Sequence, residues 1–210
     1  MSSSVPDRPY HHGDLKHALV QAGIALIEEG GIPALSLRAL AARVGVSHTA
    51  PRNHFGSLRG LLTAIAAEGF HRHARAMCEG VSDQSDPQAR LMAAMTGYVR
   101  FARAHPALFG LMFSSLHCDM RDAELMAAGR DSYAVLSGIA RGLDWDKADL
   151  PDGQRRTEVM LWSLVHGYAQ LSLAGILANG PSGTMLDFAD IMPAFAYRPA
   201  TASPAPGDRS

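Results

Sequence analysis

Apolar residues recur along the 210-residue chain at spacings of three and four, which is the period of helices that bury one face. No segment alternates as a strand would over four residues or more. The expected fold class is therefore all-α, with a three-helix head joined by a long helix to a helical bundle. The expected helices cover about 14–29, 36–44, 48–54, 58–79, 87–105, 107–113, 119–142, 154–178 and 185–195.

The stretch SLRALAARVGVSHTAPRNHFGSLRGLL, which begins at Ser36, predicts two short helices around a tight turn, with a third helix following. Ser36 is placed to cap the first helix, Gly45 supplies the turn, and Val46 fills the angle between the helices. Ser47 is placed to cap the second helix. This pattern, at about residues 36–55, is typical of a helix-turn-helix, in which a buried helix supports one that presents polar side chains to DNA.

The same stretch resembles the DNA-binding domain of the TetR family of bacterial transcriptional repressors. Near the other end, Trp162, His166 and Gly167 in WSLVHGYAQL resemble the motif of the family's WHG-type C-terminal subclass. Further matching positions are Leu19, Ala22, Ala25, Leu26, Ile27 and Gly30-Gly31 upstream, and His54-Phe55 and Leu61-Leu62 downstream.

Two positions depart from the family pattern. Arg52 stands where the family usually has a Tyr, and Leu58 stands where it usually has a Lys; both family residues contact DNA phosphate. Arg52 can replace such a contact, or pair with guanine, because guanidinium binds both bidentately. Leu58 cannot, so the departures put the DNA affinity in question.

The resemblance implies a DNA-binding domain at 1–75 and a ligand-binding and dimerisation domain at 76–197, and the charge of the chain changes sign between these two parts. Residues 1–75 contain eight Lys and Arg against five Asp and Glu, and the remainder contains eleven against fifteen. A basic head on an acidic body orients the molecule towards a polyanion. The Pro-, Ala-, Ser- and Gly-rich tail at 198–210 is expected to be disordered.

The helix expected at 154–178 carries apolar residues around nearly its whole circumference, so it must be buried on two sides. One side can face its own bundle and the other a second subunit, which the resemblance supports because TetR-like proteins dimerise through their last two long helices. Tyr168, Leu173 and Leu177 are the expected interface residues. The alternative is a central helix of a monomer.

Methionine and phenylalanine are frequent in the body, and such a flexible, polarisable interior can form a pocket for a small apolar effector. The alternative is that these residues are only core. His166 also has two alternative roles, because it can polarise a ligand or fix its helix against a neighbour. The family resemblance favours a small-molecule inducer bound among Met95, Phe109, Met112, Trp162 and His166.

Other chemistry is poorly supported. His11-His12, His71 with His73, and His117-Cys118 do not give three or four metal ligands at a known spacing, so no metal and no cofactor is expected. No nucleophile or phosphate-binding motif indicates an enzyme. Cys78 and Cys118 are expected to be small buried or half-buried groups in a reducing compartment.

The sequence thus predicts a cytoplasmic, homodimeric, ligand-responsive repressor of double-stranded operator DNA. No membrane span or signal peptide is expected. The alternative function is a helical binding or scaffold protein that has lost DNA binding. The expected DNA contacts are Ser47, His48, Thr49, Arg52, Asn53, His54 and Ser57.

Overall fold

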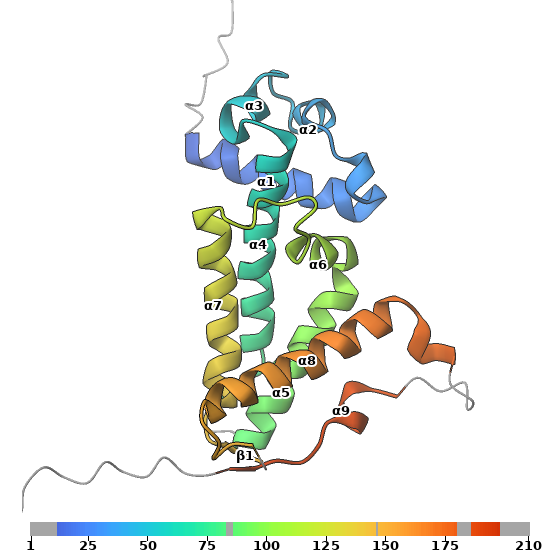
Figure 1. The fold of residues 1–210 in the computed structure, drawn as a ribbon. Helices are drawn as coiled ribbons and strands as arrows, with labels where there is room; N and C mark the ends of the chain where they lie inside the picture. Colours follow the sequence, from blue (N-terminus) through green and yellow to red (C-terminus); the bar gives the residue numbers. More distant parts are fainter. Residues whose placement is uncertain (1–11, 83–85, 146, 180–185, 198–210) are drawn as a thin grey trace, which may run out of the picture. The chain divides into compact units, whose positions relative to one another are not determined.

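The computed structural model describes residues 12–82, 86–145, 147–179 and 186–197, and it is almost entirely helical (Figure 1). The expected all-α fold is confirmed. The elements are α1 (His12–Gly30), η1 (Ile32–Ala34), α2 (Leu37–Val44), α3 (Ala50–Phe55), α4 (Leu58–Cys78), α5 (Pro87–Ala104), α6 (Pro106–Met112), α7 (Ala123–Ala140), β1 (Leu143–Asp144), α8 (Gly153–Leu173), η2 (Ile176–Asn179), α9 (Phe188–Ile191) and β2 (Ala196–Tyr197).

The chain divides into two compact units, and only contacts within a unit are considered below. The first unit comprises residues 1–74 and 101–132, and the second comprises 75–100 and 133–210. The segment 101–132, which contains α6, thus belongs to the same unit as the helix-turn-helix. The division into two functional domains at residue 75 stays a prediction, and the tail at 198–210 lies outside the described residues.

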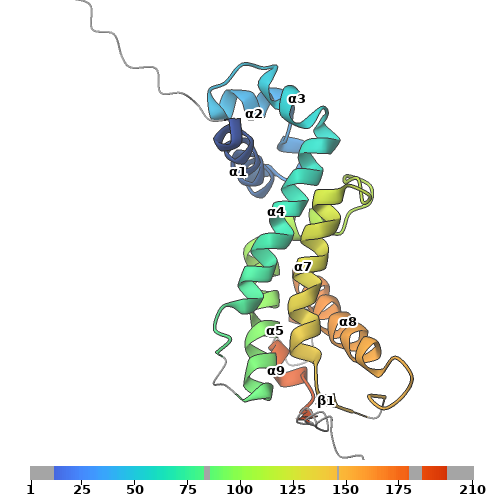
Figure 2. The same cartoon turned by 90° about the vertical axis from the view of Figure 1, so that its left-hand side faces the viewer.

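In the first unit, α1, α2 and α3 pack together as a three-helix head, with α4 following (Figures 1 and 2). Leu19, Ile27 and Leu40 are fully buried, and each such side chain contributes about 1.5–3 kcal/mol by leaving water. The Oγ of Ser36 accepts from the amide of Ala39 at 3.0 Å, so the expected cap of α2 is confirmed. Gly45 ends α2 at φ 75°, the left-handed conformation that favours glycine.

The prediction that Ser47 caps the second helix of the motif is wrong by two residues. The N-cap of α3 is Thr49, and its side chain makes no capping bond. The Oγ of Ser47 instead accepts from the amide of Thr49 at 3.2 Å and lies 2.6 Å from its hydroxyl. Such local side-chain bonds compete with helix formation, and α3 therefore begins at Ala50 rather than at His48.

The second unit is built on α8, whose buried face includes Leu161, Val165 and Ala169. The C-terminal segment is fastened to this unit by two tyrosines. The hydroxyl of Tyr168 donates to the carbonyl of Leu186 at 2.7 Å, and that of Tyr197 donates to the carbonyl of Ile139 at 2.7 Å. Strand β2 pairs with β1 in an antiparallel ladder of two residues each.

Several helix ends differ from the expected ones. The helix expected at 119–142 begins only at Ala123, because the carboxylate of Asp122 caps it by accepting from the amide of Leu125 at 2.9 Å. The helix expected at 185–195 is the four-residue α9 followed by β2. Helix α8 ends at Leu173 rather than near 178, with Gly175 in the left-handed conformation soon after. Among the described helices, none combines the length and apolar character that crossing a bilayer demands.

Candidate nucleic-acid interface

Helix α3 is short and exposes its polar side chains. Arg52 and Asn53 are exposed and His54 is half-buried, whereas Pro51 in the first turn is buried. Proline is compatible with a first helical turn because the amide it lacks would have no partner there. The buried Pro51 ring thus anchors a helix whose opposite side is left free for a partner.

The turns on either side of α3 add further exposed polar groups. Ser47, His48 and Thr49 are exposed before the helix, and Ser57 is exposed after it. The Oγ of Ser57 accepts from the amide of Gly60 at 3.0 Å, which confirms the expected cap at the start of α4. The seven predicted DNA-contact residues therefore lie together on α3 and its two flanking turns.

The charges of the head differ in their partners. Arg43 of α2 forms a two-pronged bond with Glu29, with nitrogen–oxygen distances of 2.9 and 2.6 Å. The hydrogen bond from Arg43 lowers the pKa of Glu29, and that of Arg43 is raised in return. Arg52, by contrast, pairs with no carboxylate among the described residues. Its guanidinium is therefore available to a phosphate or a guanine.

The loop before α7 is attached to the start of α4. Arg59 donates to the carbonyl of Cys118 at 2.8 Å, and the hydroxyl of Thr63 accepts from the amide of Asp119 at 2.9 Å. The Cys118 thiol is buried, and burial raises its pKa to about 11. Cys78 is exposed, so the expectation of a buried or half-buried group is wrong for that cysteine, which lies at the last residue of α4.

The predicted ligand residues are distributed over both units. Phe109 and Met112 belong to α6 in the first unit, where both are fully buried. Met95, which is also fully buried, belongs to the second unit with Trp162 and His166. The structure brings Trp162 and His166 together, with ring centroids 6.4 Å apart.

Trp162 and His166 meet at Tyr98 of α5, a residue that the sequence did not single out. The Tyr98 hydroxyl lies 2.8 Å from Nδ1 of His166. Burial raises the pKa of Tyr98 well above its usual range, although a hydrogen bond from Trp162 opposes this shift. Burial also lowers the pKa of His166, which favours its neutral form. The hydrogen bond between Tyr98 and His166 connects α8 to α5, and this is one of the two roles left open for His166.

A second polar cluster lies around Glu158 on the buried face of α8. Its carboxylate accepts from Tyr133 and Ser137, each at 2.6 Å, and from Gln154 at 2.9 Å. Burial alone would raise the pKa of Glu158, but the three hydrogen bonds together lower it. The spacing of Gln154 and Glu158 on one helix face was the only sequence signal for this cluster.

The face of α8 that turns away from its own unit is partly apolar. Val159 and Trp162 on this face are 42% and 38% exposed, and Leu171, on another side of the helix, is 43% exposed. Of the predicted interface residues, Leu173 is half-buried in α8, and Leu177 is half-buried in η2 just beyond it. Tyr168 is only 4% exposed and packs against Phe188, so it lies in the core of its own chain.

One open cleft of about 170 Å³ lies in the first unit rather than among the predicted ligand residues. It is bounded by α1, α4 and α7, and its walls carry both acidic and basic groups. Its lining residues are Lys16, His17, Val20, Ala64, Ala67, Glu68, His71 and Glu124. Across the described ranges, no group of three or more metal-ligating side chains is placed to hold an ion.

A helix-turn-helix with an exposed polar second helix defines the architecture of a DNA-binding regulator. Residues 19–65 match the family model for bacterial regulatory proteins of the tetR family, and residues 91–192 match the tetracyclin repressor-like C-terminal domain. The chain belongs to the TetR family of transcriptional regulators, which are DNA-binding transcription factors and not enzymes. The resemblance noted in the sequence is confirmed.

Solved structures share the fold of this chain. A protein of unknown function from Rhodococcus sp. RHA1 is 32% identical, with a TM-score of 0.68 over 84% of this chain and 92% of its own. A TetR regulator from Streptomyces coelicolor is 22% identical, with a TM-score of 0.59 over 77% and 74%. One from Thermus thermophilus is 19% identical, with a TM-score of 0.53 over 78% and 88%. These last two show the fold alone. No curated protein sequence matches the chain.

Proposed function

We propose that the chain is a homodimeric repressor that binds a palindromic operator through α3 and its flanking turns. The observation that carries this proposal is the exposure of Arg52 and Asn53 on a helix anchored by the buried Pro51. Arg52 pairs with phosphate or guanine, and Asn53 suits adenine. His54 and the exposed Ser57 contact the phosphate backbone.

The experiment is a selection of random-sequence duplex DNA on the purified chain, followed by a salt titration with the selected duplex. A palindromic consensus with half-sites about one helical turn apart, and an affinity that falls steeply with salt, supports the proposal. A pool that gains no consensus and binds weakly at all salt concentrations contradicts it. That outcome favours a helical scaffold protein whose head has lost DNA binding, as the departures at Arg52 and Leu58 would allow.

The homodimer belongs to this proposal because one face of α8 exposes Val159 and Trp162 to solvent, with the half-buried Leu173 on the same side of the helix. Exposed apolar side chains on one helix face are typical of a subunit interface. A two-fold dimer also presents two heads to two half-sites, which compensates for the small contact area of a single α3. A monomeric chain with full operator affinity would contradict this part.

We also propose that a small apolar effector binds in the body and releases the DNA. The support is the methionine- and phenylalanine-rich interior and the neutral, half-buried His166 beside Trp162. Reciprocity requires that operator DNA weaken effector binding by the same factor by which the effector weakens DNA binding. A ligand screen by melting temperature, repeated with operator present, measures both factors. A ligand that stabilises the chain without changing operator affinity would contradict the proposal that an effector releases the DNA in the cytoplasm.

A further inference from the structure

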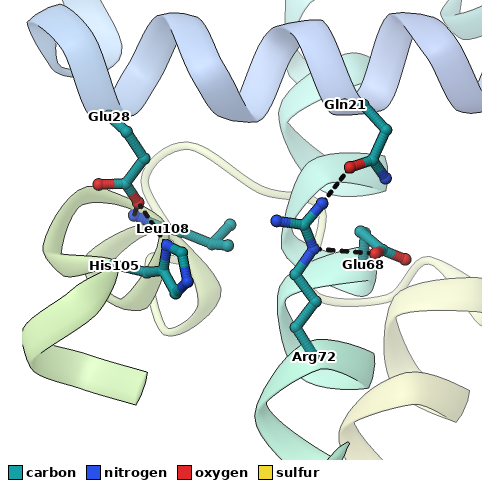
Figure 3. A network of polar contacts seen from close by, with 6 residues as sticks. All are labelled: Gln21, Glu28, Glu68, Arg72, His105 and Leu108. Atoms are coloured by element: carbon teal, nitrogen blue, oxygen red, sulfur yellow. Dashed lines mark hydrogen bonds and ion pairs between the residues drawn. The ribbon is translucent and has the colours of Figure 1, made fainter. Parts of the chain in front are cut away.

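Helix α1 is the base of the head, and polar bonds connect it to three other helices of the first unit. Figure 3 shows the bonds to α4 and α6. α1 also packs against α2 and α3, so its orientation sets that of the recognition helix. The three connections are Lys16 to Glu124 of α7, Gln21 to Arg72 of α4, and Glu28 to the amide of Leu108 in α6.

The bond made by Glu28 has an unusual geometry, because it caps a helix from a different part of the chain. Its Oε1 accepts from the amide of Leu108 at 3.0 Å, in the first turn of α6. His105, the N-cap of α6, makes no side-chain capping bond, and its Nδ1 lies 4.0 Å from the same carboxylate oxygen. The first amides of a helix need an acceptor and attract negative charge. Glu28 supplies both from α1.

The other two connections have different strengths and different partners. Lys16 and Glu124 are 45% and 62% exposed, and such surface pairs contribute little. Arg72 is more buried, donates to Glu68 at 3.0 Å and also bonds Gln21, but it holds α1 to α4 only. Among these three bonds, the one from Glu28 is therefore the polar link between α1 and α6.

α6 itself is closely packed. A Cβ on Gly69 of α4 would lie 2.8 Å from Cγ of Met112 and 3.0 Å from Cδ1 of Leu108, so a larger residue there would force these side chains of α6 to shift. Phe109, on the same helix, is fully buried and packs edge-on against Phe113. A change in the packing of Phe109 or Met112 therefore moves the N-terminal turn of α6 as well, because close-packed interiors transmit displacement.

We propose that Glu28 is a positioning residue for the recognition helix. By capping α6 from α1, it makes the orientation of the head depend on how Phe109 and Met112 are packed. The inference rests on the proposed operator binding and adds the connection through which a change in α6 alters it. An effector that repacks these two residues changes DNA affinity through one carboxylate.

The first measurement is amide hydrogen exchange in Glu28→Ala, Glu28→Gln and the neighbouring control Glu29→Ala. Glu28→Ala removes the acceptor, and we expect exchange at Leu108 to become about fivefold faster, the size of one lost cap. Glu28→Gln keeps an acceptor oxygen and restores most of the protection, which also guards against a variant that merely unfolds. Glu29 bonds Arg43 within the head, so its variant leaves Leu108 unchanged. Unchanged exchange in Glu28→Ala overturns the inference.

The second measurement is a double-mutant cycle with Phe109→Leu, read as affinity for the selected duplex. We expect Phe109→Leu to change the Kd about threefold or more when Glu28 is present, and by much less in Glu28→Ala. Equal effects in both backgrounds overturn the coupling. If no duplex is bound at all, the proposed function fails, and the same cycle is read from amide exchange in α1. In that reading, Phe109→Leu should speed amide exchange in α1 when Glu28 is present and much less in Glu28→Ala. Equal changes in both backgrounds overturn the inference.

Discussion

Helices α3 and α8 both leave one side uncovered, but they expose different chemistry. α3 has six residues and presents Arg52, Asn53 and half-buried His54. α8 has 21 residues and exposes Val159 and Trp162 on one side. Each is anchored by a buried face, so the exposed side is not a sign of poor packing. The difference indicates two kinds of partner: a polar, charged one at α3, and an apolar one at α8.

The polar contacts around the two helices support the same distinction. In the head, the described residues leave Arg52 without a carboxylate, although Arg43 nearby has one. On the buried side of α8, the carboxylate of Glu158 instead accepts hydrogen bonds from three donors of its own unit. Polar groups that already have their partners stabilise the fold, whereas those that lack them, like exposed apolar groups, are available for recognition.

The largest expected effect is at the apolar face of α8. Val159→Asp places a charge in the proposed subunit interface and should weaken dimerisation by about 3 kcal/mol or more. Sedimentation equilibrium at micromolar concentration should give twice the chain mass of 22.4 kDa for the natural sequence and a monomer for the variant. Met126→Asp, at a residue 47% exposed on α7, is the control and should leave the dimer intact. Equal masses for all three proteins would refute the interface.

The next effect is at α3. Arg52→Ala should weaken binding to the selected duplex by about 1–3 kcal/mol if Arg52 reads a base, or reduce the salt slope by about 1 if it holds a phosphate. The control is Arg130→Ala, which removes an exposed arginine from α7. Fluorescence anisotropy at several salt concentrations separates the two roles. If neither affinity nor slope changes, Arg52 does not touch DNA.

A smaller effect is expected at Glu158, and it depends on pH. Hydrogen bonds lower its pKa below the usual value of 4.5, so its contribution to stability is complete above that pH and is lost as pH falls through the lowered value. Glu158→Gln should cost about 1–2 kcal/mol in urea unfolding at pH 7. This difference from the natural sequence should shrink below pH 4.5.

Glu79→Gln is the matched control, because Glu79 forms an exposed ion pair with Arg100 in the same unit. Such pairs contribute about 0–1 kcal/mol, so the control should be nearly neutral at both pH values. A constant cost for Glu158→Gln from pH 7 down to pH 3 would show that the loss comes from packing rather than from charge.

The smallest effect is at the start of α4. Leu58 is 37% exposed, and Leu58→Lys adds a cation next to the α3 surface. Because phosphate contacts carry no direct sequence information, the variant should bind all duplexes a few-fold more tightly and raise the salt slope by about 1. The control is Leu150→Lys, at a residue 43% exposed in the second unit, which should change neither the affinity nor the salt slope. Tightening for one operator only would assign Leu58 another role.

Features fixed by neighbours in sequence were predictable. Ser36, Gly45 and Ser57 each act through atoms within four residues, and their caps and turn were placed correctly. The cap of α3 was misplaced because Ser47 and Thr49 are both suitable, and their mutual hydrogen bond decided between them. The period of apolar residues was enough for the long helices because burial of one face determines them.

Features that depend on distant residues were not predictable. Tyr98 and His166 are 68 positions apart, and Glu28 and Leu108 are 80 apart. No local pattern marks a glutamate at the end of one helix as the cap of another. The grouping of residues 101–132 with the head has the same origin, since α6 reaches α1 only once the chain is folded. The sequence predicted apolar residues around nearly the whole circumference of α8, yet the side of α8 that is exposed in the single chain is only partly apolar.

The buried thiol of Cys118 makes the loop before α7 measurable without any added label. The thiolate is the form that attacks an alkylating reagent, and a pKa of about 11 and full burial both suppress that reaction. Alkylation of Cys118 therefore requires the loop to separate from Arg59 and α4, and the alkylation rate measures how often the loop opens. Cys78 is exposed and reacts without any opening of the structure, so its rate is an internal reference for the reactivity of the reagent. The ratio of the Cys118 rate to the Cys78 rate is compared with and without DNA. A lower ratio with DNA shows that the loop opens less often from the start of α4 when DNA is bound.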